Sequence, residues 1–472
     1  MRLLQQIIFV IHSFILSIIP ITTYVEGITG QPGSFLPTQA VNHNDVTISR
    51  LIYRGLFEYD TYGNLIPDLA ESWEISGDGL VYTVTLKRDQ KWTDGTNVTA
   101  DDVIYTAFRH PVLQVVGTDR VDERTIRFIL PNKYSPFLGI LTSGIMKVDS
   151  DTIYNPLKPA SNGDFRVLSV EHSGPIVKQV VLINNNSDEK IRKLVFRYYG
   201  NEDELVTAAK LGEIDGFLAD DTHEISNFSN HRFPIQGVYY ALFFDLNNET
   251  LKDITLRQTL EKVLNKEQII YNKGIFVQGP ISRSVYTDND ITFNPYDETI
   301  QEDLEINLEI TIPDLKEHEE VAESIKQIWK DRLDVDVDIV KVDPKVFLEE
   351  VVIPRRYEIL LYGQEISRDP SRYVNWHSTQ REHPGLNLSN FEHVRADRAL
   401  EESRNEIDAD KRVVHYNEFQ KVIAEQVPAI FLYHPFKQYY VSKYIKGIGE
   451  KYTFTAGDRF LDFNNWEKIE TN

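Results

Sequence analysis

The chain has 472 residues, of which 41% are hydrophobic, and a formal net charge of -22 at pH 7. A single hydrophobic core stops growing near about 250–300 residues, so more than one domain is expected. A nucleic-acid-binding face needs clustered Lys and Arg, and the acidic balance therefore argues against nucleic acid as a partner. The sequence contains no cysteine, which excludes disulfides, thiolate catalysis, cysteine-based zinc sites and lipoprotein acylation.

The N-terminal segment 1–29 predicts export. Arg2 supplies a weak positive charge, and residues 7–21 are apolar apart from three polar positions. That length is typical of a signal peptide and is short for a spanning helix. Val25 and Gly27 are small residues at a candidate cleavage position, but Ala-x-Ala is absent, so a retained membrane anchor stays an alternative. No other apolar run approaches the length of a membrane span, so we expect membrane contact only through this segment.

Local patterns predict elements along the first part of the chain. The Gly-, Pro- and Asn-rich segment from Gly27 to Val46 favours an irregular tether. Alternation from Trp73 to Leu86, interrupted by Ser-Gly-Asp-Gly, predicts a β-hairpin. Thr99 with Asp102 three residues on resembles a capping box, so a helix should begin near Ala100. Two short strands are expected between residues 116 and 130.

The second half alternates between strand and helix patterns. Strands are expected over 191–199 and 239–248, and the helix Glu202–Leu211 should end at Gly212. Strict alternation over 304–312, helical spacing over 321–329 and renewed alternation over 335–339 predict a βαβ unit with parallel strands. Asn265 with Gln268 should cap a short helix. Two further helices are expected at 396–405 and 411–425.

Between Leu51 and Arg109 several short motifs follow one another in a fixed order. They are Gly-Leu near Tyr-Asp, Pro-x-Leu-Ala-Glu-Ser-Trp, Asp-Gly before a strand, Trp-x-Asp-Gly and Thr-Ala-Asp-Asp-Val. This set resembles the signature of the family 5 extracellular solute-binding proteins, the peptide-, dipeptide- and nickel-binding receptors of ABC importers. Ala-Ala-Lys-Leu-Gly-Glu-Ile-Asp-Gly-Phe and the strand from Tyr239 match further family positions, and the resemblance extends from about Asn44 to about Tyr444.

The resemblance implies an α/β fold of the periplasmic-binding-protein type II class, with two hinged lobes and an extra small subdomain of the cluster C kind. It divides the chain into a leader at 1–29, a discontinuous first lobe, a small subdomain at 67–154 and a second lobe at 244–437. The first lobe is then built from three pieces: 30–66, 155–243 and 438–472.

In this family the ligand lies between the lobes, and an aspartate in Trp-x-x-Asp-x-x-x-Pro holds the peptide α-ammonium. The corresponding stretch here runs from Tyr362 to Pro370, and Ile366 stands at the aspartate position. Glu365 and Asp369 flank it. A buried ammonium without a carboxylate costs several kcal/mol, so one of the two substitutes or the ligand differs. Alternatively, both carboxylates face solvent.

Other candidate ligand-binding residues also come from the resemblance. Arg54, Gly55 and Leu56 form the first cleft loop, where glycine permits close approach and Arg54 could pair with a ligand carboxylate or point to water. Tyr362 and Trp376 are candidate walls of a side-chain pocket, although aromatic residues more often belong to the core. Tyr240 is a further candidate ligand-binding residue.

Catalytic and metal motifs are incomplete. His318-Glu319 and His223-Glu224 begin like zinc-peptidase helices but lack the second histidine, and Pro280 replaces the lysine of a phosphate-binding loop. Asp94, Asp101 and Asp102 are read as turn and helix-cap residues rather than paired catalytic carboxylates. His377, His383 and His393 lack metal-ligand spacing. We expect no enzyme activity, catalytic residue, metal or cofactor.

The resemblance thus predicts a monomeric periplasmic or extracellular receptor that binds short peptides. It would deliver them to ABC permease subunits served by a separate ATPase. The alternatives are a peptide or small-molecule sensor or scaffold that kept the fold without transport, and a receptor for nickel or another solute.

Overall fold

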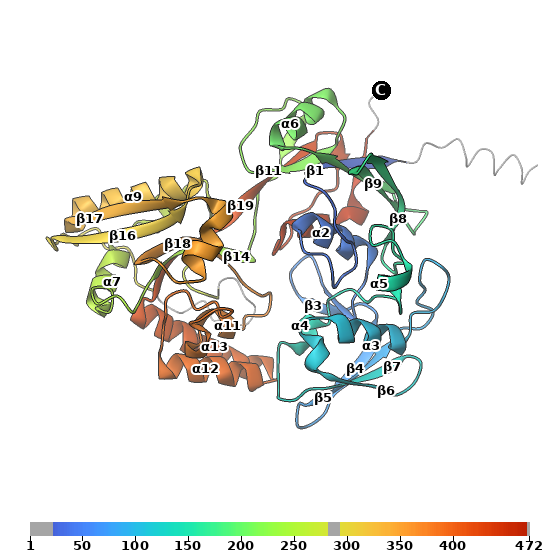
Figure 1. Ribbon diagram of the computed structural model, residues 1–472, viewed down its shortest axis with the longest axis horizontal. Helices are drawn as coiled ribbons and strands as arrows, with labels where there is room; N and C mark the ends of the chain where they lie inside the picture. Colours follow the sequence, from blue (N-terminus) through green and yellow to red (C-terminus); the bar gives the residue numbers. More distant parts are fainter. Residues whose placement is uncertain (1–21, 282–292, 470–472) are drawn as a thin grey trace, which may run out of the picture.

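The structure is a computed structural model that describes residues 22–281 and 293–469. The apolar part of the expected leader, residues 7–21, lies outside the described residues. Two groups of elements stand side by side and are joined by strand β19, Ala429–Ser442 (Figure 1). We call the group that contains β1 the first lobe and the group that contains α9 the second lobe.

A single large sheet runs through both lobes. Its strands follow the order β17-β16-β18-β14-β19-β11-β1-β10-β9-β8, and β12, β13 and β15 also pair with β19. On the first-lobe side the strands are β1 (Thr23–Thr29), β8 (Phe165–Ser173), β9 (Ile176–Asn184), β10 (Lys193–Tyr199), β11 (Gly216–Ala219), β12 (Phe228–Asn230) and β13 (Phe233–Pro234). On the second-lobe side they are β14 (Val238–Phe244), β15 (Gly274–Phe276), β16 (Ile306–Pro313), β17 (Val335–Val342) and β18 (Ile359–Glu365).

Strand β19 belongs to both lobes. Its N-terminal part pairs antiparallel with β14, and its C-terminal part pairs antiparallel with β11. The chain crosses between the lobes a second time through β12 and β13 into β14, and both short strands also pair with β19. The two crossing segments therefore lie against each other in one ladder.

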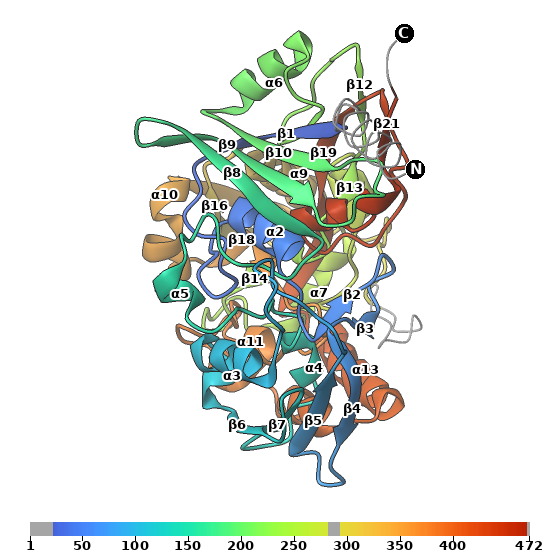
Figure 2. The same cartoon turned by 90° about the vertical axis from the view of Figure 1, so that its right-hand side faces the viewer.

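The first lobe carries its helices on the large sheet and holds a second, smaller sheet. Helix α2 (His43–Ile52) packs on β8, and α6 (Glu202–Leu211) covers β1, β10 and β11. The smaller sheet has the order β4-β5-β7-β6 and lies at the end of the lobe opposite α6 (Figure 2). Its strands are β4 (Ala70–Ile75), β5 (Val81–Leu86), β6 (Gly117–Arg120) and β7 (Thr125–Ile129).

The remaining elements of the first lobe are short, apart from α3. They are β2 (Phe57–Tyr59), β3 (Leu65–Pro67), α3 (Ala100–Arg109), η1 (Leu113–Val115), α4 (Phe137–Ile140), α5 (Ser150–Ile153), β20 (Ile445–Lys446), η4 (Ala456–Phe460), η5 (Phe463–Asn465) and β21 (Glu467–Lys468). Helix α3 begins with the predicted capping box of Thr99 and Asp102. The predicted hairpin is confirmed, with Trp73 opposite Val84.

The second lobe is built on the predicted βαβ unit. β16 and β17 are parallel neighbours joined by α9 (Lys316–Leu333), whose Trp329 is fully buried. The other helices are α7 (Ile254–Lys262), α8 (Lys266–Ile269), α10 (Pro344–Phe347), η2 (Leu348–Val352), α11 (Tyr373–Trp376), η3 (Ser378–Gln380), α12 (Val394–Asn405) and α13 (Ala409–Gln426). Asn265 caps α8 as expected, and Gly212 ends α6 with a φ of 73°.

The tether prediction holds only for the middle of its segment. Thr23–Thr29 form β1, which pairs in parallel with β10 on one side and with β11 on the other. Ser34, Phe35 and Leu36 are buried, and α2 begins at His43. The expected leader boundary at residue 29 therefore falls at the end of a central strand. Among residues 22–281 and 293–469, no helix is both long and apolar enough to cross a membrane.

Glu26 on β1 anchors a buried polar network in the first lobe. Its fully buried carboxylate accepts hydrogen bonds from the hydroxyls of Tyr24 and Tyr439, each at 3.0 Å, and from Arg459 Nε at 2.9 Å. Tyr439 lies on β19 and Arg459 on η4. One carboxylate thus ties the first strand, the crossing strand and the C-terminal segment together.

Removal of β1 should unfold the first lobe, whereas removal of the residues before it should not. A chain of residues 22–472 is expected to fold, and one of residues 30–472 is expected to leave β10 and β11 without their common neighbour. Circular dichroism and thermal unfolding of the two purified chains measure the difference. Equal melting temperatures would show that β1 is dispensable.

Glu26→Gln should leave the Arg459 guanidinium buried without its counter-charge. Breaking a buried ion pair by removing one partner lowers the free energy of unfolding by about 3–5 kcal/mol. The matched control is Glu467→Gln, which breaks the exposed Glu467–Lys190 pair and should change it by less than about 1 kcal/mol. Urea unfolding measures both, and an equal effect of the two substitutions would contradict the role of Glu26.

Candidate ligand-binding site between the lobes

A loop of the second lobe, residues 366–372 between β18 and α11, reaches the first lobe. Arg368 of this loop forms an ion pair through Nη2 with Asp458 of η4. Its Cζ lies 4.7 Å from the ring centroid of Tyr59 and 4.9 Å from that of Phe454. Only 12% of the Arg368 side chain is exposed, and this burial lowers the pKa of its guanidinium. The loop therefore places a charged group in the interface between the lobes.

Asp458, the partner of Arg368, is fully buried. Its Oδ2 accepts hydrogen bonds from the main-chain N–H groups of Phe454 and Thr455, each at 2.8 Å, and its Oδ1 accepts one from Arg50 Nη1 at 2.8 Å. Burial alone would raise the pKa of the Asp458 carboxyl, but Arg50, Arg368 and the two backbone donors lower it overall. Asp458 is therefore held as a carboxylate.

A second contact between the lobes lies at the far end of α12. Ser135, just before α4, donates from its main-chain N–H to Arg404 O at 2.7 Å and from Oγ to Ser403 O at 2.9 Å. The Arg404 guanidinium lies 5.1 Å from the ring centroid of Tyr134 and 4.2 Å from that of Tyr373. The lobes are thus joined at the 366–372 loop and at α12, as well as through the large sheet.

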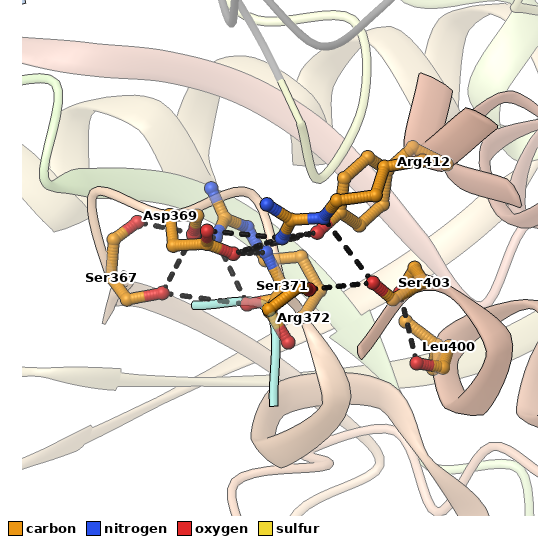
Figure 3. Close-up of polar contacts among 9 residues, drawn as sticks. Ser367, Asp369, Ser371, Arg372, Leu400, Ser403 and Arg412 are labelled. Atoms are coloured by element: carbon orange, nitrogen blue, oxygen red, sulfur yellow. Dashed lines mark hydrogen bonds and ion pairs between the residues drawn. The ribbon is translucent and has the colours of Figure 1, made fainter. Parts of the chain in front are cut away.

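Asp369, one of the two candidate carboxylates, is committed to a structural contact. Figure 3 shows the Arg412 guanidinium pointing at its carboxylate, with Nη2 at 2.8 and 3.0 Å from the two oxygens. Asp369 Oδ1 also accepts the main-chain N–H of Ser371 at 2.9 Å. The buried Arg372 donates to the main-chain oxygen of Asp369 at 2.8 Å and to that of Pro280 at 2.9 Å. These contacts fix the loop that presents Arg368.

Glu365 and Ile366, which precede this loop contact in the stretch from Tyr362 to Pro370, lie in different surroundings. Glu365 is exposed at the end of β18, whereas Ile366 is partly buried against the second-lobe core and donates its N–H to Gly237 O at 2.9 Å. The position at which the resemblance expected an aspartate is therefore apolar and packed.

Arg54, Gly55 and Leu56 follow α2 and are occupied by contacts within the first lobe. Arg54 donates from Nε to Asp68 Oδ1 at 2.7 Å and from Nη1 to Gln90 Oε1 at 2.9 Å. A Cβ added at Gly55 would lie 2.7 Å from the main-chain oxygen of Thr142, so chain packing explains the glycine. Leu56 is fully buried in the core.

Two of the three aromatic candidates lie on adjacent strands of the second lobe but point to opposite faces of the sheet, since Tyr362 is opposite Ala241 in register. Tyr240 on β14 is next to Gly363 of β18 in register and stacks on Tyr433, with ring centroids 4.9 Å apart. Burial raises the pKa of Tyr240 to about 12. Tyr362 on β18 stacks on Phe347 at 5.6 Å.

Trp376 is a core residue. It is fully buried, and its Nε1 donates to the Tyr239 hydroxyl at 3.1 Å. The structure thus places Tyr240 and Tyr362 on adjacent strands and Trp376 in the core of the second lobe.

Two cavities lie away from the lobe interface. One of about 310 Å³ is on the first lobe beside Asp94 and Arg166, and one of about 440 Å³ is on the second lobe beside Ser378 and Glu382. None of the eight candidate residues lines either cavity. The candidate site is therefore defined by the residues that face one another between the lobes.

Sequence reasoning missed Arg368 and the first-lobe residues around it. Arg368 stands two residues before Pro370 in the stretch already singled out, so its position offered a signal. Its partner Asp458 is 90 residues away along the chain, and no local pattern links the two.

These features define a two-lobed α/β binding protein. The sequence model of the bacterial extracellular solute-binding proteins, family 5 Middle, matches residues 64–382, more than half of the chain. The chain belongs to this family of solute-binding proteins, and the predicted type II binding-protein fold is confirmed.

Individual relatives are distant but cover nearly the whole chain. The periplasmic murein peptide-binding protein MppA of Escherichia coli is 21% identical over 90% of this chain and 89% of its own. The oligopeptide-binding protein OppA of Bacillus subtilis is 21% identical over 90% of each chain.

Among solved structures, the ABC transporter substrate-binding protein CtaP of Listeria monocytogenes superposes with a TM-score of 0.81 at 22% identity. That superposition covers 95% of this chain and 99% of CtaP. The oligopeptide-binding protein AppA of Bacillus subtilis, in complex with a nonapeptide, gives 0.70 at 20% identity over 95% and 99%. At these identities the likeness concerns the fold.

Asp369→Asn should destabilise the second lobe because Arg412 would lose its carboxylate partner. Both side chains are largely buried, so we expect the free energy of unfolding to fall by on the order of 3 kcal/mol. The control is Glu418→Gln, which is on α13 like Arg412 and breaks an exposed pair with Arg395 of α12. It should lower the free energy of unfolding by less than about 1 kcal/mol. Urea unfolding measures both. A change as small as that of the control would show that the Asp369–Arg412 pair does not stabilise the second lobe.

Proposed function

We propose that this protein is an extracytoplasmic receptor that binds short peptides between its two lobes and delivers them to the permease of an ABC importer. The observation that carries the proposal is the full-length similarity to relatives named as peptide-binding proteins. MppA and OppA are each matched over 90% of this chain. The export of the chain and its partnership with a separate ATPase belong to the same proposal.

The architecture supports a closing motion as the basis of function. Ligand that contacts both lobes binds the closed state more tightly than the open state, and it therefore shifts the population toward the closed state. The 366–372 loop and the end of α12 supply contacts between the lobes. A permease that recognises both lobes at once would distinguish the loaded receptor from the empty one.

The contacts of Asp369 and Ile366 favour recognition of the peptide backbone over a dedicated ammonium site. Asp369 is paired with Arg412, and Ile366 is packed in the second lobe. Main-chain groups of the loop and of the adjacent strands would then hold the peptide in extended form, which accepts varied side chains. Tyr240, stacked on Tyr433, would offer an apolar wall.

The chain of residues 22–472, purified without added ligand, should carry small peptides from the host cell. Native mass spectrometry is expected to show a mixed set of added masses, and denaturation should release peptides of a few residues. A defined peptide added after stripping should raise the melting temperature, because a ligand that binds only the folded state stabilises it by mass action.

A single non-peptide mass, or a released metal ion, would contradict the peptide proposal and keep only a solute-binding role. A stripped protein whose melting temperature responds to no peptide pool would contradict it as well. A boiled or urea-treated sample serves as the control for peptides that adhere without a folded site.

A further inference from the structure

One guanidinium in the lobe interface has hydrogen-bond capacity that the surrounding protein does not use. Arg368 Nη1 is buried, and it has no hydrogen-bond partner among the described residues. Nη2 of the same group is paired with Asp458. An arginine presents donors in a fixed planar fork, so a group on the Nη1 side meets a preset direction.

Asp458 accepts no hydrogen bond from Nη1. A carboxylate offers about four acceptor positions. Asp458 Oδ2 accepts from the N–H groups of Phe454 and Thr455 and from Arg368 Nη2, and its Oδ1 accepts from Arg50. Two guanidinium groups thus share one fully buried carboxylate.

The Arg368 side chain is also held in place. Tyr59 and Phe454 contact the guanidinium through their rings, and Asp369 and Arg372 fix the loop from which it extends. The charged or titratable groups that act most strongly on it are Asp458, Arg50, Tyr59 and Tyr452, and of these Asp458 is the carboxylate. A donor fixed on two sides is prepared for an acceptor that arrives from the ligand.

From this geometry we propose that Arg368 is the anion-recognising residue of the site, and that the ligand is a peptide whose carboxylate joins Nη1 when the lobes close. The inference rests on the proposed peptide function and adds a charge preference to it. The carboxylate could come from an acidic side chain or from the peptide C-terminus. Either source supplies a planar acceptor that suits an arginine fork.

The test uses matched pools of peptides of three to five residues and isothermal titration of the stripped protein. One pool carries a central Glu and the other a central Gln, and each is made with a free and with an amidated C-terminus. We expect one of the two carboxylates to strengthen binding at least about tenfold, a difference of about 1.4 kcal/mol. Loss of affinity on changing Glu to Gln identifies the side-chain carboxylate as the source, and loss on amidation identifies the C-terminal carboxylate.

Arg368→Gln should abolish this preference while the uncharged peptides bind within a few-fold of their native affinity. Arg368→Lys keeps the charge but not the fork, and it should retain part of the preference. Arg398→Gln, an exposed residue of α12, is the control and should leave the preference unchanged. Thermal unfolding of each variant establishes that it is folded before it is titrated.

The outcomes separate the two proposals. If the native protein binds charged and uncharged peptides equally, the role of Arg368 is wrong and the peptide function stands. If the preference persists in Arg368→Gln, another residue reads the anion and the assignment is overturned. If neither pool binds to the stripped native protein, the peptide function itself fails and this inference falls with it.

Discussion

The continuity of β19 is the constraint on which the rest of the structure depends. One strand of 14 residues supplies backbone hydrogen bonds to β14 in the second lobe and to β11 in the first. Pro435 lies in its middle and cannot donate to the ladder, and only the short strands β13 and β15 pair there. Bending is therefore easiest between the two well-paired halves, which makes the centre of β19 the natural hinge.

The contact between the lobes is built on the same framework. Arg459 reaches inward to the buried Glu26 on β1, whereas its neighbour Asp458 faces Arg50 and Arg368 at the lobe interface. Because η4 is anchored through Arg459 to β1 and β19, the Asp458 carboxylate is presented from a rigid base. A buried ion pair is a weak source of net stability, since desolvation offsets most of the attraction, but its geometry is demanding. Such a contact defines one relative arrangement of the lobes rather than many.

Local elements could be predicted from the sequence because their causes are local. The capping box at Thr99, the alternation in β16 and β17 and the glycine that ends α6 act within a few residues. Strand β1 was missed because its partners β10 and β11 lie more than 160 residues away and its apolar residues merge with the leader. The site was harder still, because its chemistry depends on pairing. Whether Asp369 is free for a ligand was decided by Arg412, which is 43 residues away.

The overall acidity of the chain does not conflict with an anionic ligand. A net charge of -22 acts over long distances, but at physiological ionic strength the Debye length is about 8 Å, so most of that field is screened in solvent. A guanidinium buried between two lobes is screened much less, and its effect is felt only after the lobes have excluded water. The surface charge then governs solubility and the rate of encounter. On the proposal made above, selection of the ligand rests with the loop in which an apolar residue, Ile366, stands where a carboxylate was expected and an arginine follows two residues later.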